Sequence, residues 1–412
     1  MEKVETVVYK FGGSVLDSVS SIKKVAELIK NISQSKKRIV VVVSALKGQT
    51  DELLKMAQLL SNNSGASSDL DNLLSMGERT SARFMCIALK ALGVDAVLID
   101  PESDLWPIFT DDNYGNANPD LELTKEAVKN KLVPLLEENK IPVICGFLGK
   151  NKKGQITTLG RGGSDLTAVL LGKCLNTNSV MLVKDVPGIK SGDPKKVEKA
   201  NTVKALDTLE TQILSSSGAK VIQSKALQYK SDDSVICIVG INNGKITDEG
   251  TTITGKSQPE LEISIMEKLI QLITIIGDNV TEPKLLSQFF EDLHKQKIEV
   301  LGATLESWCI MLLVVDNPQQ KPFKVVHELI SKRGIGKSAT CYDNLNLIFI
   351  KGQDFVKIPG IISKITLPLT MEGINIYSLL PTASSIKVLV HSKDGEKALK
   401  LIKNSFQTSK PS

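Results

Sequence analysis

Histidine is scarce in this chain, which has only three among its 412 residues, and no two of them are close in sequence. A zinc site built on histidines and a Ser-His-Asp triad are therefore not expected. The six cysteines are also far apart and form no Cys-x-x-Cys pair. This spacing favours free thiols in a reducing compartment over a disulfide framework, and we predict no side-chain metal site.

Aromatic residues make up only 4% of the chain, and the formal net charge of +5 is small for its length. Both values argue against a nucleic-acid partner, which would require stacking platforms or a basic stripe. No apolar run approaches the roughly 20 residues of a membrane span, so we expect no membrane contact. The first strand pattern begins within a few residues of Met1 and leaves no room for a signal peptide, which predicts a cytoplasmic protein.

The remaining composition is that of a globular protein, with 42% apolar and 24% charged residues. Strand patterns alternate with helical patterns through the first three-fifths of the chain. The apolar, β-branched strand patterns are 4–11, 38–46, 94–100, 141–147, 179–185 and 235–240. The helical patterns are 17–34, 51–60, 70–92, 122–138, a segment from about Asp165, and 219–228. This alternation predicts an α/β domain on a mostly parallel sheet.

The pattern changes after residue 257, where the order β-α-β-β-α-β occurs twice and predicts two ferredoxin-like modules. The expected elements are strands 269–278, 297–307 and 308–316 with helix 282–296, then strands 344–353, 373–381 and 385–392 with helices 359–371 and 395–406. We predict domains 1–258, 259–343 and 344–412, with the last two able to interleave in sequence.

The stretch TTLGRGGSD, ending at Asp165, places three glycines and Arg161 directly before a helical pattern. Glycines allow a ligand to approach the backbone, and a helix N-terminus offers free N–H groups and a positive dipole end. Arg161 adds a fork suited to a carboxylate. An anion site is the functional interpretation, and a helix simply capped by Ser164 or Asp165 is the structural alternative.

Three other polar segments follow predicted strands or interrupt an apolar helix. Gly12 and Gly13 follow the first strand, with Lys10 beside them, and the loop from Ser44 to Thr50 follows the second. Glu78 and Arg79 lie within an apolar helical pattern, and a solvated helix face is the alternative for this pair. Because ligands bind at the carboxyl ends of strands in open α/β sheets, we expect these segments to line one crevice.

A Walker phosphate-binding motif is absent, because the stretch RGIGKS at 333–338 is preceded by Ser331 at the position where the motif requires its first glycine. We interpret this stretch as a turn.

Six segments, in this order, resemble the aspartokinase family: KFGGS, VVVSALKGQTDELL, MGERTSARF, GFLGKN with TTLGRGGSD, KDVPGIKSGDP and SSGAKVIQSKA. The resemblance covers almost the whole chain. It implies the amino-acid kinase fold followed by paired ACT domains. It also implies transfer of the γ-phosphoryl group of ATP, with Mg²⁺ carried by the nucleotide, to the side chain of L-aspartate. The product, 4-phospho-L-aspartate, begins lysine, threonine and methionine synthesis. An amino-acid effector at the ACT domains and a homodimer or higher homo-oligomer are further implications.

The same resemblance implies roles for individual residues. Lys10 and Asp165 are implied to be catalytic, with Asp165 organising the lysines and the metal–nucleotide. The residues implied to bind ATP and its phosphates are Lys10, Phe11, Gly12, Gly13, Lys184, Asp185, Lys190, Lys195, Lys220 and Val221. The residues implied to bind aspartate are Ser44, Thr50, Glu78, Arg161, Gly162, Gly163 and Ser164.

Some positions depart from the family pattern. KFGGSV is one residue shorter than the usual KFGGTSV, Lys184 replaces a threonine or serine, and Lys190 replaces a tyrosine. Other amino-acid kinases share the shorter glycine turn, so a glutamate or acetylglutamate kinase is one alternative. A non-catalytic ACT ligand sensor is another, although Lys10, Asp165, Asp185 and Lys220 are all present.

The chemistry agrees with the histidine-poor composition. A carboxylate nucleophile has an ordinary pKa of about 3.9 and is ionised at neutral pH without a general base. Such a reaction needs two anions aligned and their repulsion cancelled, which lysines, backbone N–H groups and Mg²⁺ can do.

Overall fold

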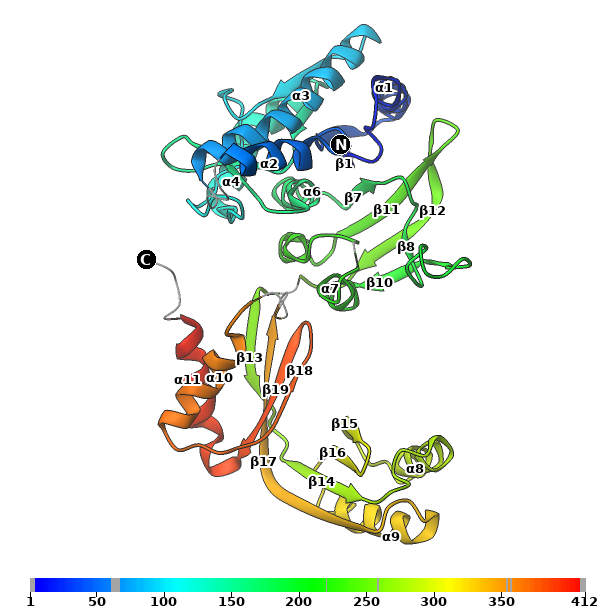
Figure 1. The fold of residues 1–412 in the computed structure, drawn as a ribbon. Coiled ribbons are helices and arrows are strands. Elements are labelled where there is room, and N and C mark those ends of the chain that lie inside the picture. The colour runs from blue at the N-terminus through cyan, green and yellow to red at the C-terminus, as the bar shows by residue number, and fades with distance from the viewer. Residues whose placement is uncertain are drawn as a thin grey trace. The chain divides into compact units, whose positions relative to one another are not determined.

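The computed structural model describes residues 4–60, 67–219, 221–257, 259–352, 355 and 358–407. The chain divides into two compact units, Met1–Glu260 and Leu261–Ser412 (Figure 1). Each unit is described by itself below.

The first unit is built on an eight-stranded sheet with the order β10-β12-β11-β7-β1-β2-β4-β3. Its strands are β1 (Thr6–Phe11), β2 (Arg38–Val43), β3 (Ala96–Ile99), β4 (Ile141–Cys145), β7 (Ser179–Val183), β10 (Ala205–Asp207), β11 (Val235–Asn242) and β12 (Lys245–Thr254). All neighbouring pairs are parallel except β11 with β12. This confirms the predicted α/β class with a mostly parallel sheet.

Helices pack around this sheet in two groups. The first contains α1 (Val19–Ser33), α2 (Gln49–Leu60) and α3 (Ser68–Ala91), and the second contains α4 (Leu121–Ala127), α5 (Val133–Glu137) and α6 (Gly163–Cys174). The central strands β1 and β2 are buried from their second residue to their last. Their β-branched side chains are covered on both faces, as expected for a parallel sheet between helices.

Two helix predictions need correction. The helix expected over 122–138 is interrupted by a π-helical turn, Val128–Leu132, directly before α5, where Pro134 lacks the N–H that a regular helix would use. The helix expected over 219–228 is a 3-10 helix, Ser224–Tyr229, and it is preceded by α7 (Thr208–Ser216), which the periodicity did not indicate. Short hairpins β5–β6 (Leu148–Lys150, Ile156–Thr158) and β8–β9 (Ile189–Lys190, Thr202–Val203) complete the unit.

The second unit is one antiparallel sheet in which the long strand β17 (Ser338–Gly352) contributes to two helix-covered cores. The other strands are β13 (Leu261–Ile265), β14 (Ile270–Ile276), β15 (Val300–Glu306), β16 (Cys309–Val315), β18 (Ile376–Pro381) and β19 (Ser385–His391). The first part of β17 pairs with β14, and its second part pairs with β13 and β19.

Each half of β17 belongs to its own helix-covered core. One core includes Phe289 and Leu293 of α8 (Pro283–Lys295) and Leu329 of α9 (Pro322–Arg333). The other lies under α10 (Ile361–Met371) and α11 (Gly395–Gln407), and β13 packs against it although β13 falls within the range 259–343 predicted for the first module. The RGIGKS stretch forms the end of α9 and the turn into β17.

Within the described part of the chain, no helix combines the length and the apolar character that crossing a bilayer requires.

Candidate active site

The carboxyl ends of β7, β1 and β2 lie side by side at one edge of the first sheet. Phe11, the last residue of β1, is paired in register with Val183 of β7 and Val43 of β2. Beyond Phe11 the glycine turn begins, and the Gly12 amide donates a hydrogen bond to the Val183 carbonyl, 3.2 Å away. The loops that follow these three strands therefore emerge together, and those after β1 and β2 are two of the segments that the sequence placed at one edge.

Lys10, Asp165 and Lys184 form an ionic cluster at this edge. The Lys10 ammonium lies 2.6 Å from one oxygen of Asp165, and the Lys184 ammonium lies 3.3 Å from the other. Burial acts to raise the pKa of Asp165, but the two ammonium groups outweigh it and hold the pKa below its ordinary value. One carboxylate thus aligns two cations, and the cluster keeps a net positive charge suited to an anionic ligand.

Asp165 reaches the lysines because α6 begins earlier than the sequence indicated. The N-cap is Gly162, in the left-handed conformation with φ 83°, and no side chain caps this end. The alternative in which Ser164 or Asp165 merely caps the helix is therefore wrong. Asp165 lies in the first turn instead, and glycine is the residue that adopts the required backbone without strain.

Glu78 approaches the same edge from α3. It is 3% exposed, so the solvated-face alternative is also wrong, and one of its carboxylate oxygens accepts a hydrogen bond of 3.1 Å from the Ala45 amide, just beyond β2. The other carboxylate oxygen is buried and has no hydrogen-bond partner. Burial raises the pKa of Glu78 to about 7, against the opposing effects of the Ala45 amide and Lys10. An unpartnered carboxylate oxygen of this kind is a candidate for binding a cationic ligand group.

The two glycines of the first turn differ in how much space surrounds them. A Cβ on Gly13 would lie 2.7 Å from the Ala45 carbonyl oxygen, whereas a Cβ on Gly12 would lie 3.6 Å from its nearest neighbours. Gly13 is therefore required for the close packing of the first loop against the loop after β2, which carries the Glu78 contact.

We expect Gly13→Ala to lower the free energy of unfolding by about 1–3 kcal/mol, because the backbone at Ala45 must move. Gly12→Ala is the matched control and should cost less than about 1 kcal/mol, since its Cβ meets ordinary contacts. Denaturant unfolding of both variants measures the difference, and equal stabilities would contradict this packing argument.

A further segment, around Val221, is tied to the ionic cluster. The Lys184 ammonium donates a hydrogen bond to the Val221 carbonyl. The Gln223 side-chain amide donates to the Leu159 carbonyl at 3.2 Å, and a Cβ on Gly162 would lie 3.0 Å from the Cβ of Gln223. Lys220, which the sequence analysis placed beside the ATP phosphates, lies outside the described residues.

The remaining residues predicted to bind the nucleotide make contacts in different parts of the unit. Asp185 follows Lys184 and accepts a hydrogen bond of 2.9 Å from the Ser14 hydroxyl, which joins it to the glycine turn. The Lys190 ammonium instead donates to the Thr202 hydroxyl within the β8–β9 hairpin. Lys195 is exposed in the loop between these two strands.

The predicted substrate-side residues come from the loop after β2, the first turn of α2 and the start of α6. The Ser44 amide donates to the Phe11 carbonyl at 3.1 Å, and the Thr50 hydroxyl would lie 3.8 Å from a Cβ on Gly77. Ser164 packs against Gly146, because a Cβ built on Gly146 would lie 2.8 Å from the Cβ of Ser164. Arg161 is exposed and has no hydrogen-bond or ion-pair partner among the described residues, so its guanidinium group is free for a ligand.

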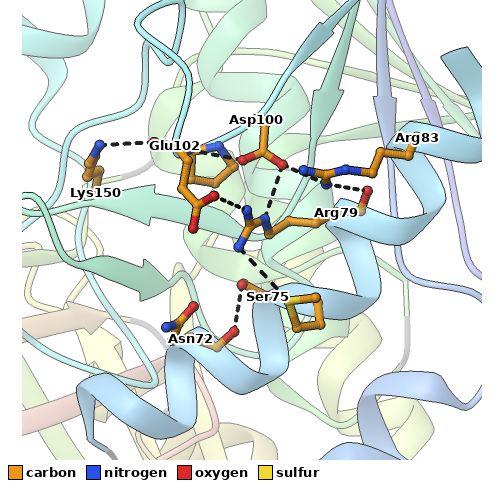
Figure 2. A network of polar contacts seen from close by, with 9 residues as sticks. Asn72, Ser75, Arg79, Arg83, Asp100, Glu102 and Lys150 are labelled. Carbon is orange, nitrogen blue, oxygen red and sulfur yellow. Dashed lines mark hydrogen bonds and ion pairs between the residues drawn. The ribbon is translucent and has the colours of Figure 1, made fainter.

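Asp71 was not singled out in the sequence, whereas Arg79 was singled out together with Glu78 but without a partner. Asp71 of α3 is fully buried and accepts hydrogen bonds from the Gly115 amide and from the amide and hydroxyl of Thr158. Arg79 is buried in an ion-pair network with Asp100 (Figure 2). In the sequence, Asp71 and Arg79 are charged residues at apolar positions of a helical pattern. Nothing in the sequence identified the residues with which they pair.

No group of three or more His, Cys, Asp or Glu side chains in the described ranges could hold a metal ion. Both oxygens of Asp165 face ammonium groups, which leaves this carboxylate poorly suited to be a dedicated metal ligand. These residues are better suited to a divalent ion that is already bound to the phosphate oxygens of a ligand than to an ion that the protein itself coordinates.

Several known aspartokinases are similar to this chain. The chain is 35% identical to the aspartokinase of Rickettsia felis over 261 residues, which are 61% of each chain. It is 28% identical to aspartokinase 2 of Bacillus subtilis over 98% of both chains. The solved aspartate kinase of Synechocystis superposes with a TM-score of 0.80 at 25% identity, covering 97% of this chain and 69% of that one.

Family descriptions match both units. Residues 342–404 match the ACT domain. Residues 5–240, more than half of the chain, match the description Amino acid kinase family. The edge formed by β7, β1 and β2 lies within the second of these ranges, and the chain belongs to the amino acid kinase family.

Proposed function

We propose that this protein is an aspartate kinase that transfers the γ-phosphoryl group of ATP to the side-chain carboxylate of L-aspartate. The observation that carries the proposal is the Lys10–Asp165–Lys184 cluster beside buried Glu78, in a chain similar along its length to aspartokinases. The match to the Rickettsia relative covers 61% of that protein, and the match to the Bacillus relative covers 98%.

On the nucleotide side, Lys10 and Lys184 supply positive charge where the phosphoryl group moves. Gly12 and Gly13 let the phosphates approach the backbone, and Asp165 holds the two ammonium groups in place. A Mg²⁺ ion bound to the phosphates would neutralise further charge. We assign Phe11, Asp185, Lys190, Lys195, Lys220 and Val221 to the same nucleotide site.

On the acceptor side, Arg161 is the proposed partner of an aspartate carboxylate, because its planar guanidinium can make two parallel hydrogen bonds. Glu78 is the proposed partner of the aspartate ammonium group, which would satisfy its free carboxylate oxygen. Ser44, Thr50, Gly162, Gly163 and Ser164 complete the acceptor site. The reacting carboxylate is already ionised, so these residues bind and align it and no proton is removed.

A coupled assay of ADP release with aspartate, glutamate or acetylglutamate as the acceptor tests the proposal. We expect ADP release with aspartate as the acceptor and none with glutamate or acetylglutamate. Preference for glutamate or acetylglutamate would indicate another amino-acid kinase, and turnover with none of the three would favour a ligand sensor.

Aspartate use should depend on the ionisation of Glu78. Below its pKa of about 7, Glu78 is neutral and cannot pair with the ammonium group of aspartate. We expect kcat/KM for aspartate to fall about tenfold between about pH 8 and about pH 6, with a smaller change in kcat at saturating aspartate. Initial-rate measurements across this range test the prediction.

The groups facing Glu78 support this assignment. Lys10 faces it from β1, and the Cys145 thiol faces it from the end of β4. Burial holds the pKa of Cys145 well above its ordinary value, so the thiol does not titrate in this range. Glu78→Gln should therefore abolish the acid decline, and a decline that persists in this variant would assign it to another group.

We also propose regulation by an amino acid bound at the ACT unit, a homodimeric or higher assembly, and a cytoplasmic location in which the product enters lysine, threonine and methionine synthesis. The six free cysteines are consistent with a reducing compartment. In the ACT unit we assign β13 to the second module, because it packs in the core of α10 and α11. Activity assays with added threonine, lysine or methionine test the regulatory part.

A further inference from the structure

Arg79, Arg83, Asp100 and Glu102 form a continuous ionic network between α3 and the segment that follows β3 (Figure 2). The Arg79 Nε lies 3.1 Å from an Asp100 oxygen, and its Nη2 lies 2.6 Å from Glu102. Arg83 contacts the same Asp100 oxygen at 2.8 Å. The side chains of Arg79 and Asp100 are only 8% and 6% exposed, so this pair is the buried centre of the network.

The network remains charged at neutral pH. Burial acts to raise the pKa of Asp100, but the Glu102 amide and the two guanidinium groups outweigh it and hold the pKa below its ordinary value. A buried ion pair of this kind contributes little net stability, and an apolar pair of similar size is often as stable. The pair is therefore poorly explained as a stabilising feature alone.

Arg79 directly follows Glu78, and the two side chains anchor the same turn of α3 in different directions. Glu78 points to the Ala45 amide after β2, whereas Arg79 points to Asp100 after β3. The Glu78 carboxylate has one hydrogen bond and an unpartnered oxygen, which is a weak hold for a buried acidic group. On the side of α3 that faces β3, three ion pairs hold the helix: Arg79–Asp100, Arg79–Glu102 and Arg83–Asp100.

The segment that receives Arg79 is itself fixed. The Glu102 amide donates to the second Asp100 oxygen at 3.0 Å, and Lys150 at the end of β5 donates to the Pro101 carbonyl at 3.0 Å. On the helix, the Arg83 guanidinium donates to the Arg79 carbonyl. The network thus joins the turn of α3 that carries Glu78 to an anchored position in the sheet.

We propose that Arg79 and Asp100 are positioning residues for the acceptor: their directional ion pair fixes the turn of α3 that holds Glu78 at the aspartate subsite. The inference rests on the proposed function. Asp100 and Glu102 each contact one nitrogen of the Arg79 guanidinium. These directional contacts favour one rotation of α3 about its axis and one position along that axis. Apolar side chains would fill the same space in several arrangements.

The experiment compares wild type with the double variant Arg79→Met/Asp100→Leu, which removes both buried charges together. Thermal unfolding should remain close to wild type. The KM for aspartate should rise about tenfold or more, with the KM for ATP and kcat within about threefold. The acid decline of kcat/KM should also move to lower pH, because a loosely held Glu78 becomes better solvated. A purely structural pair would not produce that shift.

The matched control is Arg333→Met/Asp292→Leu, which removes an Arg–Asp pair of 2.6 Å in the other unit and should leave the aspartate KM unchanged without effectors. A stable Arg79/Asp100 variant with wild-type KM and pH profile would overturn the inference. If that variant does not fold, Arg79→Lys keeps the charge without the fork, and an unchanged aspartate KM in it would overturn the inference equally. Wild-type enzyme inactive with aspartate would instead refute the proposed function and the inference with it.

Discussion

Lys10→Ala should lower kcat about 10²- to 10³-fold while changing the KM values for ATP and aspartate much less. The Lys10 ammonium lies 2.6 Å from Asp165 at the point where the phosphoryl group would move. Its charge is most valuable as negative charge shifts during transfer, so its loss should appear in the transition state rather than in substrate binding. Steady-state kinetics with each substrate varied separately measures this division.

Lys37→Ala is the matched control for Lys10→Ala. Lys37 is a partly exposed lysine that pairs with Glu5 just before β2 begins, at the opposite edge of the sheet. Asp165 keeps Lys184 as a partner in Lys10→Ala, so the fold should persist. A kcat within about threefold of wild type in a folded Lys10→Ala enzyme would remove Lys10 from the reaction.

Arg161→Ala should raise the KM for aspartate about 30- to 160-fold, because a charge-assisted hydrogen-bonded contact is worth about 2–3 kcal/mol. Arg161 is exposed and has no partner in the described part of the chain, so its removal should not destabilise the fold. Titration of aspartate at saturating ATP gives the KM directly, and kcat should change less.

Two further variants test whether the change in KM comes from the guanidinium group at position 161. Arg161→Lys keeps the positive charge without the planar fork and should give an intermediate KM. Arg38→Ala, at the first residue of β2 and therefore at the opposite edge, should leave the aspartate KM unchanged. An Arg161→Ala enzyme with unaltered aspartate dependence would show that the acceptor site has been placed wrongly.

The central strands and the shared edge could be predicted from the sequence because their signals are local. β1 and β2 are short β-branched runs, and Gly12–Gly13 and Gly160–Gly163 are turn signals beside charged residues. Parallel strands place their carboxyl ends at one edge, so the position of the Gly12–Gly13 turn followed from the fold class, whereas Gly160–Gly163 follow the hairpin strand β6 outside the parallel sheet.

Elements that depend on their surroundings were harder to predict. β12 has mainly exposed or half-buried residues without a clear alternation, and it is recognised only through its antiparallel pairing with β11. α7 did carry a usable signal, a capping box of Asp207 and Glu210, which the search for apolar periodicity passed over.

The partners of buried charges could not be predicted from sequence patterns, and only the family resemblance implied that Asp165 organises lysines. Arg79 and Asp100 are 21 positions apart, and only the packing of α3 against the end of β3 makes them an ion pair. Lys184 similarly joins Asp165 to Val221 across three segments of the chain. Sequence periodicity can place such residues on a buried face, but partner choice is a property of the tertiary structure.

The central claim is that one sheet edge aligns ATP with the side-chain carboxylate of aspartate. Incubating the enzyme with ATP, Mg²⁺, aspartate and hydroxylamine, followed by mass and fragmentation analysis, tests it most directly, because hydroxylamine traps an acyl phosphate as a hydroxamate. We expect the hydroxamate of the aspartate side chain, formed by wild type and strongly reduced in Lys10→Ala. A hydroxamate of another acceptor, or no trapped product from active wild-type protein, would show that this edge does not phosphorylate the side chain of aspartate.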